Sequence, residues 1–389
     1  MMNVESQYSL IFNAKPRWLV RGPGRVNLLG EHVDYNEGPV LPAAIDQAIW
    51  IAADVSKSEL ITLHALDLKE KITFVAEGLE KKLDINGRPL PTWAHYPAGV
   101  AWILSQNGYK IEGIHAVYSS NIPMGSGLSS SAAIEVAFAA LWQTISGWDC
   151  DRLRLAQLCQ KAENEYVGVA CGIMDQFATA CGVKDHALYF DTRSFEWYPI
   201  PLPKETVIVI ADSGMRRSLT HSAYNERRAA CEEAVRLLKK FKPDITSLRD
   251  ISPTEFAAYG EYLPALIKKR AEHVVKEIAR VESAVNALRR DDTESFGALM
   301  FAGHASLRDY YEVSIPEIDV LVCLARNLPG CIGARMTGGG FGGCTVNLVW
   351  AAQVNDFIDG LERGYLEKTG KQAKVYVCHA SEGTSVTCI

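Results

Sequence analysis

Three segments rich in glycine and polar residues carry the side chains most suited to chemistry, and the first of them indicates a phosphate site. In residues 121–135, Gly125 and Gly127 precede a run of three serines. Backbone N–H groups at a helix start can hold an anion, and glycine lets the chain approach it closely. The segment has neither the Walker A lysine nor a GxGxxG pattern. It predicts a phosphate loop of another kind, with an N-capped helix after a tight turn as the plain alternative.

Residues 23–38 form a second segment, too polar for a core strand. Carboxylates beside an imidazole and an amide suit a polyhydroxylated ligand, because each sugar hydroxyl both donates and accepts a hydrogen bond. An ordinary solvated loop is the alternative. The hydrogen-bonding side chains of this segment are Arg25, Asn27, Glu31, His32, Asp34, Tyr35 and Asn36.

Residues 333–346 form the third segment, with five glycines in the six positions 338–343. Glycine at this density costs conformational entropy when the chain becomes ordered. A fold tolerates that cost where the backbone passes close to a ligand or to another loop. The segment therefore predicts such a close approach, and a bulged hairpin is the alternative.

Short apolar stretches between turn residues predict the strands that position these segments. After Ser131 the apolar period becomes that of a helix, which Gly147 is placed to end. The second half reads as long amphipathic helices on one face of a small mixed or antiparallel sheet. We place the boundary between the halves in the region 185–203. The predicted strands are 18–21, 48–55, 114–120, 187–190 and 207–211, with more in 332–350 and 374–379; the helices are 131–146, one from 151, 223–240, 269–290 and 293–309.

Composition excludes several classes of protein. Hydrophobic residues are 48% and charged residues 22%, typical of a globular chain, and the net charge of −6 gives no footprint for nucleic acid. The first fourteen residues hold Glu5 and no Lys or Arg, which argues against an export or transit leader. No uninterrupted apolar window approaches the roughly 18 residues of a membrane span. Ten scattered cysteines show no zinc-ligand spacing, so we expect reduced thiols in a cytoplasmic protein.

The three segments occur in the order found in the GHMP small-molecule kinases, and the chain resembles that superfamily. Within it, residues 24–36 are similar to the signature of the galactokinase family. The likeness covers almost the whole chain, apart from the first dozen residues and about 78–91. It implies an α+β, two-domain fold with the active site in the cleft between the domains. The N-terminal domain, residues 1–195, would be ribosomal S5-like, and the C-terminal domain, residues 196–389, ferredoxin-like.

The resemblance implies transfer of a phosphoryl group from ATP to the C1 hydroxyl of α-D-galactose, the first committed step of galactose catabolism. Asp175 would accept the hydroxyl proton, and Arg25 beside it would attract the transferring phosphoryl oxygens. Because phosphoryl transfer is loose, positioning and charge neutralisation should dominate, and a base should contribute about 10²- to 10⁴-fold. Taken alone, Asp175 is better explained as a helix-capping aspartate, and the surrounding motif reverses that preference.

The family pattern also assigns the binding residues. Glu163 could instead be a plain helix glutamate, and Trp93 and Tyr96 could be core aromatics. The assignments are galactose to Glu31, His32, Asp34, Gly172, Asp175 and Tyr224; Mg²⁺ to Ser131 and Glu163; adenine to Trp93 and Tyr96; and the ATP phosphates to Pro123, Gly125, Ser126, Gly127, Leu128, Ser129, Ser130, Ser131 and Ala132.

Two departures from the family pattern touch the choice of sugar. Val33 stands where threonine is usual, and Glu37 where a small or amide residue is common. The alternatives are therefore a kinase for a related sugar, such as N-acetylgalactosamine or arabinose, or a galactose-sensing regulator without catalysis. The intact serine run and the presence of Asp175 and Arg25 disfavour the sensor. We expect a monomer whose partners are galactose and ATP.

Overall fold

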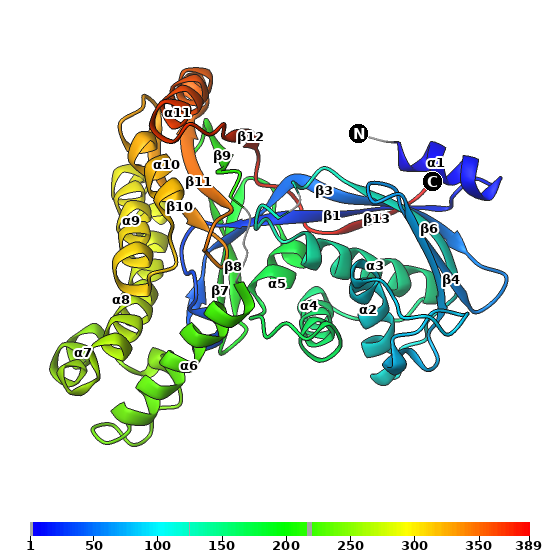
Figure 1. Cartoon of the computed structure of the whole chain (residues 1–389), viewed down its shortest axis with the longest axis horizontal. Coiled ribbons are helices and arrows are strands. Elements are labelled where there is room, and N and C mark those ends of the chain that lie inside the picture. Colours follow the sequence, from blue (N-terminus) through cyan, green and yellow to red (C-terminus); the bar gives the residue numbers. More distant parts are fainter. Residues whose placement is uncertain (1–2, 124, 216–219) are drawn as a thin grey trace.

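The first half of the chain is built on a six-stranded sheet (Figure 1). The computed structural model describes residues 3–123, 125–215 and 220–389. In this sheet β4 and β6 run parallel, and the other neighbouring pairs are antiparallel. The spatial order of strands is β13 (Ser385–Cys388), β1 (Trp18–Asn27), β3 (Pro42–Val55), β6 (Ile114–Ser120), β4 (Leu60–Ala65) and β5 (Glu70–Val75).

Helices cover both faces of this sheet (Figure 1). A short helix, α1 (Val4–Phe12), packs on one face through Val4 and Tyr8. On the other face α3 approaches β1 closely, because Gly22 has no side chain: a Cβ there would lie 2.5 Å from the carbonyl oxygen of Ala133. This contact fixes the start of α3 over β1. The helices of that face are α2 (His95–Gln106), α3 (Ser130–Ser146), α4 (Arg152–Ala162) and α5 (Met174–Cys181).

The second half is built on a four-stranded antiparallel sheet with helices packed against it. A small three-stranded sheet, β2 (Pro39–Val40), β7 (His186–Asp191) and β8 (Trp197–Pro201), packs against α8. The four strands are, in order, β10 (Cys331–Thr337), β11 (Cys344–Trp350), β9 (Thr206–Asp212) and β12 (Lys374–Cys378), and the helices are α6 (Thr220–Leu238), α7 (Pro253–Tyr259), α8 (Ala265–Arg289), α9 (Thr293–Ser306), α10 (Pro316–Arg326) and α11 (Val354–Thr369).

Short helical turns complete the chain and shape the site. Two π-helical turns, η4 (Glu163–Val167) and η7 (Leu307–Tyr311), follow α4 and α9, and turns of this kind often occur at functional sites. The single-turn 3₁₀ helices are η1 (Asp34–Asn36), η2 (Leu79–Lys81), η3 (Thr92–Ala94), η5 (Leu248–Asp250), η6 (Gly260–Tyr262) and η8 (Ala351–Gln353).

The structure confirms the α+β class and, with different bounds, the strands and helices predicted around the three polar segments. One expectation was wrong: β1 continues to Asn27, so residues 23–27 belong to a buried strand although they were expected to be too polar for one. The strand region 332–350 consists of β10 and β11, joined through the glycines. Sequence analysis did not predict β4, β5 or α2. The last strand, β13, pairs with β1. This part of the C-terminal segment therefore belongs to the N-terminal sheet, which the predicted division into residues 1–195 and 196–389 does not describe. The boundary near residue 195 stays a prediction.

Candidate active site

A cavity of about 580 Å³ lies where the two halves of the chain meet. Each of the three polar segments contributes to its wall, so residues far apart in sequence face one space. Its lining comprises Arg25, Glu31, His32, Asp34, Tyr96, Pro123, Gly125, Gly127, Leu128, Ser129, Ser130, Ser131, Glu163, Gly168, Val169, Ala170, Cys171, Gly172, Met174 and Asp175 from the N-terminal half, and Tyr224, Asn225, Gly338 and Gly339 from the C-terminal half.

The serine-rich loop connects β6 to α3 along one wall of the cavity. Gly125 and Gly127 have φ angles of 71° and 83°, in the left-handed region that favours glycine. Ser129 also lies there, with φ 59°, and α3 begins at the next residue. The first N–H groups of a helix have no partner within it, so this end of α3 offers donors to an anion.

Arg25 and Asp175 form the centre of the site. Arg25, 3% exposed on β1, donates from Nε and Nη2 to the two carboxylate oxygens of Asp175, at 2.7 Å each. Its Nη1 donates to the carbonyl oxygen of Gly127 at 2.7 Å. The Ser129 hydroxyl donates to Asp175 Oδ2. This set ties β1, the serine-rich loop and the first turn of α5 together, and it leaves the carboxylate facing the cavity.

The polar segment after β1 supplies Glu31, His32 and Asp34 to the wall of the cavity. Burial raises the pKa of Glu31 to about 7 against the opposing charge of Arg335. Burial, and then the nearby charge of Asp175, raise the pKa of Asp34 to about 6. Gly172 lets its backbone lie close to the Asp34 side chain, since a Cβ at Gly172 would lie 1.6 Å from Asp34 Oδ2.

Ser131 and Glu163 lie on the cavity wall. The Glu163 carboxylate is buried, as is that of Glu135 behind it. Gln176 Nε2 donates to Glu163 Oε2 at 2.6 Å and to Glu135 Oε2 at 3.0 Å. Burial and then Asp175 raise the pKa of Glu163 to about 7, and burial and then Glu163 raise that of Glu135. Among the described residues, neither carboxylate forms an ion pair with Lys or Arg.

This donor set fits a magnesium ion in part. A hydroxyl and a buried carboxylate without a cationic partner are oxygen ligands of the kind that Mg²⁺ takes. In the described part of the chain, no group of three or more His, Cys, Asp or Glu side chains could hold a metal. A magnesium ion at Ser131 and Glu163 would therefore need further oxygens from a nucleotide or from water.

Not every predicted residue reaches the cavity. Tyr96 and Tyr224 line it, whereas Trp93 does not: its indole Nε1 donates to Glu70 Oε2 at 2.6 Å, and its ring packs against Tyr118. Ser126 and Ala132 are buried beside the wall without lining it.

Several lining residues were not assigned from the sequence: Gly168, Val169, Ala170, Cys171, Met174, Asn225, Gly338 and Gly339. The glycine density of the third segment was a signal for the last two, since it predicted a close approach of backbone.

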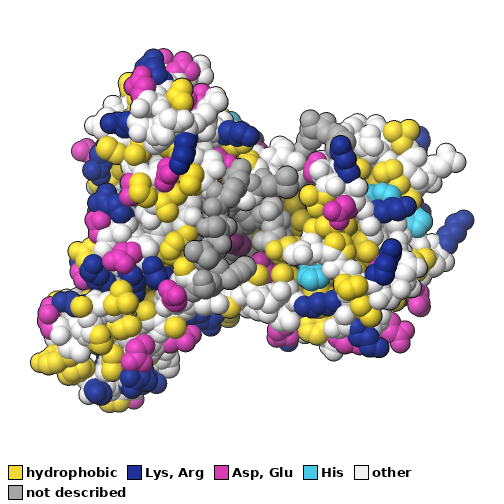
Figure 2. Space-filling model, in the orientation of Figure 1, with side chains coloured by type: hydrophobic (Ala, Val, Ile, Leu, Met, Phe, Trp, Pro, Cys, Tyr) yellow, Lys and Arg dark blue, Asp and Glu magenta, His cyan; other side chains and the backbone are white. Residues whose placement is uncertain are grey.

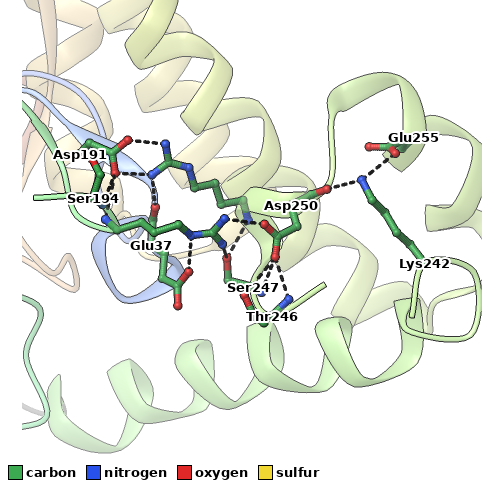
Figure 3. Close-up of polar contacts among 10 residues, drawn as sticks. Glu37, Asp191, Ser194, Lys242, Thr246, Ser247, Asp250 and Glu255 are labelled. Atoms are coloured by element: carbon green, nitrogen blue, oxygen red, sulfur yellow. Dashed lines mark hydrogen bonds and ion pairs between the residues drawn. The ribbon is translucent and has the colours of Figure 1, made fainter. Parts of the chain in front are cut away.

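The two departures from the family pattern both lie away from the cavity. Val33 is fully buried in the core. Glu37 Oε2 accepts from Arg193 Nε at 2.5 Å, and Arg249 Nη1 donates to the Glu37 carbonyl oxygen at 2.7 Å (Figure 3). Neither side chain lines the cavity.

The surface agrees with the charge balance of the sequence. On the face shown in Figure 2, Lys and Arg side chains are interspersed with Asp and Glu over both halves. Among the described residues, no helix combines the length and the apolar character that crossing a bilayer requires.

Three family models match the chain. The galactokinase galactose-binding signature matches residues 6–55, the GHMP kinase N-terminal domain residues 95–183, and the GHMP kinase C-terminal model residues 284–363. The polar segment 23–38 thus falls in the first match, and the serine-rich loop, Glu163 and Asp175 fall in the second.

Curated relatives and solved structures agree with these models. The chain is 44% identical to the galactokinase of Roseiflexus sp. (strain RS-1) over 96% of this chain and 93% of the relative. It is 42% identical to the galactokinase of Chloroflexus aurantiacus over 97% and 95%. The crystal structure of Lactococcus lactis galactokinase complexed with galactose superposes with a TM-score of 0.92 at 34% identity, covering 98% of both chains. Methanococcus jannaschii mevalonate kinase, with a TM-score of 0.66 and 18% identity, shares the fold. This chain therefore belongs to the galactokinase family of the GHMP kinases.

Proposed function

We propose that the protein transfers the terminal phosphoryl group of ATP to the C1 hydroxyl of α-D-galactose, giving galactose 1-phosphate. The observation that carries this proposal is the Asp175 carboxylate, which Arg25 and Ser129 hold in a cavity between a helix N-terminus and a sugar-type hydrogen-bonding wall. Membership of the galactokinase family supports the same reaction. Formation of galactose 1-phosphate would be the first committed step of galactose catabolism.

In this reaction Asp175 accepts the proton of the attacking hydroxyl. The charge of Arg25, next to both carboxylate oxygens, attracts the transferring phosphoryl oxygens as well. Because the transition state is loose, holding the two substrates in line supplies most of the acceleration, and the base adds about 10²- to 10⁴-fold.

The nucleotide would lie along the serine-rich loop. Family membership implies ATP as the phosphoryl donor. Ser131 and Glu163 would hold Mg²⁺, which when bound neutralises phosphate charge. Tyr96, on the wall, is placed for adenine contact, and we keep Trp93, which precedes α2, as a second candidate.

The sugar would lie against Glu31, His32, Asp34, Gly172 and Tyr224. Directional hydrogen bonds from these groups can distinguish an axial from an equatorial C4 hydroxyl. Neither Val33 nor Glu37 lines the cavity, which supports galactose over a related sugar. We also propose that the protein works as a monomer. The location that we propose is cytoplasmic, a compartment in which cysteines stay reduced.

One assay tests the proposal. The purified protein is incubated with ATP, Mg²⁺ and, separately, galactose, N-acetylgalactosamine, arabinose and glucose, and sugar 1-phosphates are followed by ³¹P NMR. We expect the highest kcat/KM for galactose. A higher value for another sugar would change the substrate, and galactose binding without any transfer would indicate a sensor.

A further inference from the structure

A buried ionic network lies directly behind Glu31. Arg335 on β10 is fully buried, and its Nη2 lies 2.8 Å from Glu31 Oε2. Its Nη1 donates to Oε1 of Glu277, a buried residue of α8, at 2.9 Å. Glu31 Oε2 also accepts from Asn27 Nδ2 at 2.8 Å, and Glu31 Oε1 accepts from the N–H of Gly338 at 2.9 Å. The carboxylate that faces the cavity is thus held by donors from both halves of the chain.

The same network fixes the backbone that carries Glu31. Glu277 Oε1 accepts from the N–H of Gly30 at 2.9 Å, and Arg335 Nη1 donates to the carbonyl oxygen of Leu28 at 3.3 Å. His273 Nε2 lies 3.2 Å from the carbonyl oxygen of Glu31. A carbonyl oxygen only accepts, so this ring nitrogen carries the hydrogen. Burial lowers the pKa of His273 to about 4, which keeps the ring neutral.

We propose that Arg335 and Glu277 are positioning residues for the sugar, fixing the Glu31 carboxylate and its loop against the cavity from the C-terminal half. This inference rests on the proposed function. Neither residue lines the cavity, so neither would touch a substrate there.

Two observations favour positioning over mere stabilisation. Arg280 Nη1 donates to Glu277 Oε2, so the network contains two arginines and two glutamates. Buried ion pairs are often no more stable than apolar residues of the same volume, so stability alone gives little reason to keep them. The fold also leaves room for the guanidinium: a Cβ at Gly303 of α9 would lie 3.1 Å from Arg335 Nη1. Only the planar fork of arginine can contact both carboxylates at once, and a lysine would have to choose between them.

The test compares Arg335→Lys and Glu277→Gln with a matched control, Arg21→Lys. Arg21 donates to Ile45, Ser381 and Glu382, outside the cavity. Galactose Kd is measured by calorimetry without nucleotide, followed by kcat and both KM values. We expect Arg335→Lys and Glu277→Gln to raise galactose Kd and KM about tenfold or more, with ATP KM changed less than about twofold and kcat less than about threefold. The control should match the parent.

A panel of monodeoxygalactoses adds a readout that a merely structural role would not move. In the parent, each monodeoxygalactose should bind more weakly than galactose. The hydroxyl that Glu31 binds is the one whose removal raises Kd less in Glu31→Gln than in the parent. Arg335→Lys should shrink the penalty for the same hydroxyl and for no other. If near-UV circular dichroism shows Arg335→Lys unfolded, Glu277→Gln, which keeps the side-chain size, decides the question by the same measurements.

Three results would overturn the inference: unchanged galactose Kd in the variants, equal rises in both KM values, or a reduced penalty at a different hydroxyl. The parent assay separates this outcome from failure of the proposed function. A parent that phosphorylates no hexose refutes the function, whereas an active parent with unaltered variants refutes the positioning role alone. If the parent prefers another hexose, the same measurements are made with that sugar.

Discussion

The guanidinium of Arg25 binds both oxygens of the Asp175 carboxylate, with two N–O distances of 2.7 Å, although the two residues are 150 positions apart. A bidentate pair of this kind fixes orientation as well as charge. The remaining acceptor positions of the carboxylate therefore have a defined direction. The reacting hydroxyl would meet a preset acceptor, which is what in-line phosphoryl transfer requires.

Asp175→Asn should lower kcat by about 10²- to 10⁴-fold, the range expected for losing a general base. The amide keeps the size of the side chain, so the fold should remain. Stopped-time assays of product measure kcat, and thermal unfolding checks the fold. A kcat within about threefold of the parent would contradict the role of Asp175.

Gly172→Ala should weaken galactose binding about 10- to 100-fold, because a Cβ would lie 1.6 Å from Asp34 Oδ2 and displace that carboxylate. The measurement is galactose Kd by calorimetry. Gly147→Ala is the control, since a Cβ there meets no atom within 4 Å. With φ 68° it should cost about 1–2 kcal/mol of stability and leave galactose Kd unchanged. Equal Kd values for Gly172→Ala and the parent would contradict the contact.

Glu163→Gln should raise the Mg²⁺ concentration required for half-maximal activity about tenfold or more, because it removes a charged oxygen ligand. Binding of ADP with and without Mg²⁺, measured by calorimetry, gives a second readout: the variant should lose the tightening by Mg²⁺. Glu165→Gln is the control, since Glu165 is exposed and its nearest ion-pair partner is Lys161 at 3.8 Å. Retained Mg²⁺ dependence in Glu163→Gln would remove this residue from the metal site.

The elements that carry strong local patterns could be predicted from the sequence. The helix after Ser131 has a continuous apolar face and a glycine at its end, and β9 is a continuous apolar strand. In contrast, β4 alternates between buried and less buried residues over only six positions, Leu60–Ala65, and so short an alternation is a weak signal for a strand. Strand β13, with four residues, is ordered by its pairing with β1, which no local pattern encodes.

The residues of the site also differ in how far the sequence could predict them. Family resemblance named Asp175 and Arg25, but only the fold shows that β1 and α5 bring them into contact. Family resemblance assigned both Trp93 and Tyr96 to adenine, yet Trp93 precedes α2 and its indole is directed to Glu70. Arg335 could not be predicted as a partner of Glu31, because a single charge on a strand usually faces solvent and its partners come from distant segments.

Galactose affinity should fall as the pH falls below about 7. Burial raises the pKa of Glu31 to about 7 and that of Asp34 to about 6, so each gains a proton as the pH drops through its value. Protonation removes acceptor capacity from the sugar wall. Kd should therefore rise by up to about tenfold for each pH unit below the pKa of a required carboxylate. Calorimetry between pH 5.5 and 8 measures this, and Glu31→Gln should have a flatter profile. A parent Kd that is constant over this range would contradict the prediction.

Glu37→Gln should leave the choice of sugar unchanged. The Glu37 carboxylate is directed to Arg193, in a group of ion pairs that also includes Arg193 with Asp250 and Arg249 with Asp191 (Figure 3). The Glu37 and Arg193 side chains are 43% and 37% exposed, so losing their ion pair should cost no more than about 1 kcal/mol of unfolding free energy.

The ratio of kcat/KM for galactose to that for N-acetylgalactosamine should stay within about twofold of the parent in Glu37→Gln, because each hydrogen bond lost to a substrate would change it by tenfold or so. Glu31→Gln, on the cavity wall, is the positive control and should change this ratio or the galactose KM itself. If Glu37→Gln changed the sugar preference and Glu31→Gln did not, the sugar would have to contact Glu37 and not Glu31, which would contradict the prediction.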